Sequence, residues 1–131
     1  MESPPTDVTN AELSVLKRLW SAGPSTIREL TDALYPGGSA SHYSTVQKLL
    51  ERLEAKRCVG RRTRGRAHEF RARVGRGELI VRRLRQTADR LCGGSLTPLL
   101  TQLVDSESLT DDELRTLRDL VADRTGKGSE P

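Results

Sequence analysis

Residues 44–70 have the sequence STVQKLLERLEAKRCVGRRTRGRAHEF, and this stretch decides the fold. Its first part predicts an amphipathic helix that begins near Ser41 or His42 and ends near Lys56, because apolar residues recur at i, i+3, i+4 and i+7. Those residues are Val46, Leu49, Leu50 and Leu53. Its second part predicts two short strands on either side of Gly65, which adopts a positive φ at a turn without steric cost. The stretch therefore predicts a helix followed by a basic β-hairpin.

Two further helices are predicted ahead of this stretch by paired capping signals. Thr9–Glu12 and Thr26–Glu29 are both capping boxes, in which a threonine hydroxyl and a glutamate carboxylate satisfy amides of the first helical turn. Three helices followed by a basic hairpin are the pattern of a winged helix-turn-helix. We assign this domain to residues 9–76, after a flexible N-terminus at residues 1–8.

The charge of the chain is concentrated in one segment. The net charge of the 131 residues is only +4, but residues 48–76 hold eleven Lys or Arg against three Asp or Glu. A basic stripe of this kind is typical of a protein that binds a polyanion, although a solvated basic face is the alternative. Aromatic residues are 3% of the chain, which argues against a protein that stacks on single-stranded nucleic acid.

Residues 77–124 predict three more helices with leucine-rich faces. The segment is too short to stabilise a core of its own, so we expect it to be a dimerisation region that packs against a second copy of the chain. The alternative is a monomer in which these helices fold back on the winged helix. The residues expected in the dimer contact are Leu84, Leu91, Leu96, Leu99, Leu100, Leu103, Leu114, Leu117 and Val121. The fold class is therefore mainly α, and residues 125–131 are expected to be a disordered tail.

The first turns of the third helix are expected to enter the major groove of duplex DNA. Gln47 has the donor and acceptor that pair with adenine, Lys48 suits guanine, and Thr45 offers a methyl group to thymine. Ser44 completes this face. The alternative for each is an ordinary exposed helix residue.

Other residues are expected to contact the DNA backbone. Arg52 is expected to bind a phosphate, and Tyr43 either packs in the core or directs its hydroxyl at a phosphate. Thr26 and Arg28 begin the second helix, whose N-terminal amides can hold a phosphate. The hairpin arginines are expected to meet phosphates or enter the minor groove; they are Arg62, Arg64 and Arg66.

The sequence offers no candidate active site or cofactor site. No catalytic Ser/His/Asp or Cys/His set, phosphate-binding loop or zinc motif is present, so we expect neither an enzyme nor a metal or cofactor. Cys92 lies on an expected dimer helix, where a buried apolar role is favoured over a redox switch. No apolar run reaches the length of a membrane span, and residues 1–8 lack the features of a signal peptide. We expect a cytoplasmic protein without membrane insertion.

The combination of motifs resembles the penicillinase repressor family of bacterial transcriptional regulators. The resemblance covers about residues 8–123, in order and with the expected spacing. It is carried by Thr9–Glu12 with Val15–Leu16 and Leu19–Trp20, by Ser44–Val46 with Leu49–Lys56, by Arg64–His68 with Phe70, by Gly94–Ser95, and by Leu109–Leu114 with Leu117.

The resemblance implies a homodimeric repressor that binds double-stranded DNA at a palindromic operator. In β-lactam-responsive members, a membrane metalloprotease sensor triggers cleavage of an Asn–Phe bond in the dimerisation region. The matching position here is Gln102–Leu103, which departs from that pattern. Copper-responsive members carry Cys-x-Cys pairs near the C-terminus, and this sequence has none.

Two other functions are compatible with the same residues. One is a winged-helix regulator that releases DNA when a small ligand binds. The other is a protein-interaction adaptor whose basic stripe binds an acidic partner.

Overall fold

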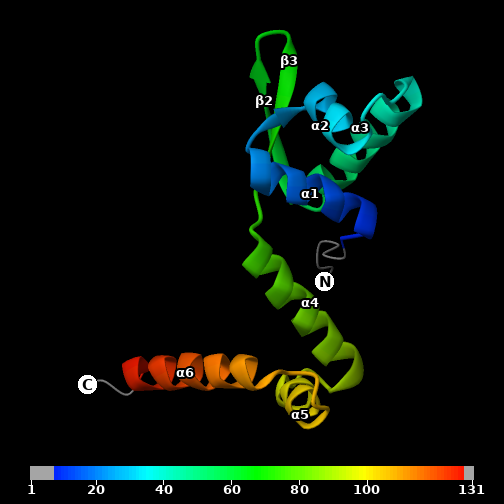
Figure 1. Ribbon diagram of the computed structural model, residues 1–131. Helices are drawn as coiled ribbons and strands as arrows, with labels where there is room; N and C mark the ends of the chain where they lie inside the picture. Colours follow the sequence, from blue (N-terminus) through cyan, green and yellow to red (C-terminus); the bar gives the residue numbers. More distant parts are fainter. Residues whose placement is uncertain (1–7, 129–131) are drawn as a thin grey trace. The chain divides into compact units, whose positions relative to one another are not determined.

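The computed structural model describes residues 8–128 and begins with three helices and a hairpin. These elements are α1 (Asn10–Ala22), β1 (Ser25–Thr26), α2 (Ile27–Leu34), α3 (Ala40–Ala55), β2 (Val59–Arg64) and β3 (Ala67–Ala72). The strands form an antiparallel sheet in the order β1-β3-β2, so the hairpin is joined to the short strand ahead of α2 (Figure 1). This is the winged helix-turn-helix that the sequence predicts, with β2 and β3 as the wing.

The core of this part lies between the three helices and one face of the sheet. Phe70 from β3 and Leu16 from α1 are fully buried. The apolar stripe of α3 faces inward as predicted, because all four of its members are buried: Val46, Leu49, Leu50 and Leu53. Val8 is also buried, which corrects its assignment to a flexible N-terminus. It precedes the N-cap Thr9 and belongs to the same apolar cluster as Leu13, the arrangement of a hydrophobic staple.

The capping boxes form at the predicted helix starts. Glu12 N–H donates to Thr9 Oγ1 at 3.1 Å, and Thr9 N–H donates to Glu12 Oε1 at 3.0 Å. The same pair of bonds joins Thr26 and Glu29 at the start of α2. These bonds satisfy amides that a helix cannot pair internally, and they fix where α1 and α2 begin.

The wing has a two-residue turn, and this turn sets its register. Gly65 has a φ of 62°, whereas Arg66 is not among the residues with positive φ. A positive φ at the first loop residue alone matches a type II′ turn, which suits the twist of a hairpin. The register that follows places Arg64 opposite Ala67 and Arg62 opposite Glu69.

Three helices follow the wing: α4 (Arg76–Leu91), α5 (Thr97–Asp105) and α6 (Asp111–Gly128). The chain divides into two compact units that meet within α4, between Arg83 and Leu84, whereas the sequence places the boundary after Arg76. Trp20 Nε1 donates to the Val74 carbonyl at 2.8 Å, and the Arg76 guanidinium stacks over the Trp20 ring. These contacts explain why the start of α4 belongs to the first unit.

Leu96 is the N-cap of α5, with Pro98 in its first turn. The second unit differs from expectation at the end of α6. α6 continues to Gly128, so residues 125–128 are helical and their assignment to a disordered tail was wrong. Residues 111–128 contain no proline that would block the helix at residue 124. The remainder of the predicted tail, residues 129–131, lies outside the described residues, as do residues 1–7.

Most large apolar side chains of the second unit lie exposed. Within its described residues, Ala88 is the one buried apolar residue, and α5 has no buried residue. The exposed fraction is 77% for Leu91 and 41% for both Leu103 and Leu117. An exposed apolar surface of this kind is typical of an interaction surface.

Candidate nucleic-acid interface

One face of α3 is exposed. Ser44, Thr45, Gln47 and Lys48 are all exposed, on the side of the helix opposite the buried stripe. The Thr45 hydroxyl donates to the Ser41 carbonyl at 3.0 Å, so its hydrogen is already used within the helix. The predicted base-reading residues therefore share one accessible surface near the start of α3.

The start of α3 is held by residues that the sequence did not single out. Ser39 N–H donates to His42 Nδ1 at 3.1 Å, and the His42 ring stacks on Tyr35 with centroids 4.4 Å apart. A Cβ on Gly38 would lie 2.7 Å from the Tyr35 carbonyl oxygen, so only glycine fits this turn. His42 thus acts as a cap that fixes the first turn of α3.

Tyr43 lies on the surface, so it does not pack in the core, and its contact with a phosphate stays a prediction. Its exposed fraction is 38%, and the Arg28 guanidinium lies 5.9 Å from its ring centroid. Both residues line a depression between α2 and the start of α3, together with Asp32 and Ser44. Thr26 is different, because it is buried and its hydroxyl accepts the Glu29 amide. Of the two residues predicted at the start of α2, Arg28 has the accessible side chain.

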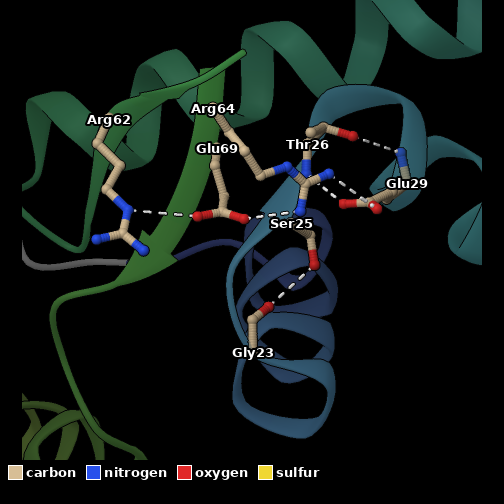
Figure 2. A network of polar contacts seen from close by, with 7 residues as sticks. All are labelled: Gly23, Ser25, Thr26, Glu29, Arg62, Arg64 and Glu69. Carbon is tan, nitrogen blue, oxygen red and sulfur yellow. Dashed lines mark hydrogen bonds and ion pairs between the residues drawn. The ribbon is translucent and has the colours of Figure 1, made fainter. Parts of the chain in front are cut away.

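The wing arginines Arg62 and Arg64 lie in a network of carboxylates (Figure 2). Arg64 Nη1 lies 2.8 Å from Glu69 Oε2, and Arg64 Nη2 lies 3.1 Å from Glu29 Oε2. Arg62 Nε makes a longer contact of 3.4 Å with Glu69 Oε1. The Thr26 amide and then the Arg64 guanidinium hold the pKa of Glu29 below its usual range. The network joins the wing to the first turn of α2.

The opposite face of the wing rests on α3. Arg61 forms two hydrogen bonds with Glu54, at 2.6 and 2.8 Å, and its guanidinium stacks over Phe70 at 4.8 Å from the ring centroid. At the end of α3, Lys56 Nζ lies 2.6 Å from the buried Glu12 carboxylate of α1. These contacts hold α3 and the wing in one rigid arrangement.

Only some basic residues of the stripe at residues 48–76 are available to DNA, because others form ion pairs within the protein. In the described part of the chain, seven of the eleven basic residues of the stripe form no ion pair: Lys48, Arg52, Arg57, Arg66, Arg71, Arg73 and Arg76. The surface of α3 supplies Lys48 and Arg52, and the wing turn supplies Arg66. A face with exposed donors, flanked by unpaired cations, suits the grooves and phosphates of duplex DNA.

The sequence missed the acidic members of the network. The sequence shows Glu29 only as part of a capping box and gives no role to Glu69. A two-residue turn at Gly65 and Arg66 places Glu69 opposite Arg62, so the register held a usable signal. Nothing in the local pattern shows that Arg64 reaches Glu29, 35 residues away in the sequence.

The described residues offer neither a metal site nor a membrane segment. Among residues 8–128, no cluster of three or more His, Cys, Asp or Glu could hold a metal ion. No helix in that range is both long and apolar enough to cross a bilayer. Cys58 is a buried free thiol whose pKa is raised by burial, and Cys92 is partly buried.

The fold and this face define a winged helix-turn-helix, DNA-binding transcriptional regulator. Residues 8–123 match the family described as penicillinase repressor, and the chain belongs to that family. The family resemblance carried by the sequence motifs is thereby confirmed. Members of such a family are regulators of transcription and generally not enzymes.

The chain is similar to one further protein in sequence and to one solved structure. An "Uncharacterized 16.5 kDa protein in ptsI 3'region" of Latilactobacillus sakei is 26% identical over 124 residues, which are 95% of this chain and 84% of that protein. The crystal structure of the transcriptional regulator Tm0710 from Thermotoga maritima is 22% identical, with a TM-score of 0.46. That alignment covers 95% of this chain and 81% of the other.

Proposed function

We propose that the protein is a homodimeric repressor that binds a palindromic operator in double-stranded DNA. The observation that carries the proposal is the exposed face of α3, where Thr45, Gln47 and Lys48 stand opposite a buried stripe. Gln47 would pair with adenine, Lys48 with guanine, and the Thr45 methyl with thymine. Ser44 borders these residues, and Arg52 further along the helix would bind a phosphate.

We propose that residues beside this face contact the DNA backbone. Arg28 and Tyr43 line a depression next to the start of α3, and Thr26 is the N-cap of α2, whose N-terminal amides could hold a phosphate. In the wing, Arg66 would meet the adjacent backbone or minor groove. Arg62 and Arg64, which the sequence also predicts as contacts, are paired with Glu69 and Glu29 in the DNA-free protein. If about six phosphates are neutralised per dimer, the logarithm of affinity falls with the logarithm of salt concentration at a slope near −5.

Dimerisation is proposed for the second unit. Its described helices expose Leu84, Leu91, Leu100, Leu103, Leu117 and Val121, while Leu96, Leu99 and Leu114 are partly buried. A second copy of the chain would cover these side chains, and a two-fold dimer matches the symmetry of a palindrome. The protein would act in the cytoplasm, where it meets the chromosome.

We propose that the repressor is released when a membrane metalloprotease sensor triggers cleavage in the dimerisation region. Gln102 and Leu103 are both exposed on α5, but they lie within a regular helix that must open before a protease can cut it. Co-expression with a neighbouring membrane metalloprotease, followed by mass measurement of the repressor, tests this step. An intact chain under induction would favour release by a small ligand.

Selection from a random duplex library, followed by footprinting, tests the proposed function. We expect protection of two half-sites related by a dyad. Lys48→Ala should reduce the discrimination between operator and random duplex by about 1–3 kcal/mol. Arg52→Ala, which removes a phosphate contact on the same helix, is the matched control and should weaken both duplexes alike. A wild-type protein with no preference for any sequence would point to the adaptor instead.

A further inference from the structure

The three wing arginines differ in what surrounds them. Arg62 and Arg64 are two residues apart on β2, so they lie on the same face of the hairpin as Glu69. Arg66 lies in the turn and forms no ion pair in the described part of the chain. Figure 2 shows Arg64 between the carboxylates of Glu69 and Glu29, with Arg62 on the far side of Glu69.

Glu69 is a nearly buried carboxylate whose shorter ion pair is with Arg64. The exposed fraction of its side chain is 8%, and a carboxylate this buried is costly unless a cation pairs with it. Arg64 contacts it at 2.8 Å, whereas the Arg62 contact is 3.4 Å long. Moving the Arg64 guanidinium to a DNA phosphate would leave Glu69 with only the longer contact.

Glu29 gives Arg64 a fixed anchor on the helix-turn-helix. Its carboxylate accepts the Thr26 amide at 2.9 Å in the capping box and also receives Arg64 at 3.1 Å. Thr26 is paired with Glu69 between β1 and β3. One guanidinium fork therefore connects the wing, the central strand and the first turn of α2, a geometry that a single ammonium group cannot reproduce.

We propose that Glu29, Arg64 and Glu69 form a latch that fixes the wing to the start of α2. Arg64 is a positioning residue, and Arg66 is the wing cation that meets the DNA. This inference rests on the proposed function for its consequence in DNA binding. The latch itself exists in the free protein and is measurable there.

Hydrogen exchange in the DNA-free protein tests the latch. Arg64→Lys keeps the positive charge but cannot bridge both carboxylates, and Arg66→Lys is the matched control. We expect the amides of residues 25–26 and 69–70 to exchange about threefold faster in Arg64→Lys and unchanged in Arg66→Lys. Glu69→Gln should give the same acceleration, and combining it with Arg64→Lys should add nothing further. Equal exchange in all variants overturns the latch.

The salt dependence of operator binding tests the division of roles. Arg66→Gln should reduce the magnitude of the slope by about 2 per dimer, since each phosphate contact contributes about 0.9. Arg64→Gln should weaken binding about threefold while leaving the slope unchanged. A slope lowered by Arg64→Gln as much as by Arg66→Gln would make Arg64 a phosphate contact and overturn the inference. If the wild-type protein shows no operator preference, the proposed function fails, and the exchange measurement still decides the latch.

Discussion

The buried ion pair between Lys56 and Glu12 gives the sharpest test of how α3 is held. Lys56 Nζ lies 2.6 Å from Glu12 Oε1, and the Glu12 side chain is 1% exposed. The pair connects the C-cap of α3 to the first turn of α1. Lys56→Met keeps much of the aliphatic stem but removes the ammonium, so the Glu12 carboxylate stays buried without its cation.

The expected cost follows from this geometry. Breaking a fully buried pair costs about 3–5 kcal/mol, because the remaining charge is uncompensated. Lys56 is 15% exposed, and Glu12 still accepts the Thr9 amide at 3.0 Å, so water and one donor offset part of the loss. We expect Lys56→Met to lower the free energy of unfolding by about 2–3 kcal/mol. For a domain of this size, that corresponds to a fall in Tm of about 10 °C or more.

Chemical denaturation of all variants at the same protein concentration measures the effect, because any contribution from dimer dissociation is then the same in each. Glu12→Gln is the matched variant, because glutamine keeps the capping geometry and the Lys56 side chain, which is 15% exposed, has access to water. Its loss should be about 1 kcal/mol. The double variant carries no uncompensated charge and should recover most of the stability lost in Lys56→Met. A loss below about 0.5 kcal/mol in Lys56→Met, or strictly additive losses in the double variant, would refute the role of the pair.

Three further predictions concern stability and assembly. Arg57 follows the C-cap of α3 with a φ of 63°, which is strained for a residue with a Cβ, so Arg57→Gly should raise the free energy of unfolding by about 0.5–1 kcal/mol. Thermal denaturation measures this gain, and a loss of stability would show that the residue is not strained. Hydrogen bonds from Arg61 lower the pKa of Glu54, so in acid the folded state binds fewer protons than the unfolded state. The stability that this carboxylate adds is therefore lost as the pH falls below about 4.5, and Glu54→Gln should flatten that part of the profile of stability against pH. Leu103→Asp should raise the dissociation constant of the dimer at least tenfold in sedimentation experiments, because it would bury an unpaired charge in the contact. Ser108→Asp is the control and should leave the dissociation constant unchanged.

Much of the first unit could be predicted from short stretches of sequence. Thr9 with Glu12, and Thr26 with Glu29, each fix a helix start through bonds that span three residues. The apolar period of α3 fixes its inward face, because a helix repeats every 3.6 residues. Gly65 fixes the hairpin turn, since its φ of 62° costs nothing without a Cβ.

The local pattern was less reliable at the chain ends and for single side chains. The sequence predicts Val8 in a flexible terminus, yet the residue is buried in the core cluster. Its burial depends on residues distant in the chain, which no local pattern reports. α6 was ended at residue 124, yet it runs to Gly128. The sequence does not settle whether the Tyr43 side chain lies in the core or on the surface, and only the packing of α2 against α3 decides it.

By itself, the sequence determined the helices of the first unit, the wing and the family, because each depends on residues close together in the chain. Only the tertiary structure decided which charges remain available to DNA. Arg64 and Glu29 are 35 residues apart, and Lys56 and Glu12 are 44 apart, so no local pattern reports that they neutralise one another. Eleven basic residues in one segment therefore become seven free of ion pairs in the described chain. A basic side chain is available to DNA only when no buried or neighbouring carboxylate already pairs with it.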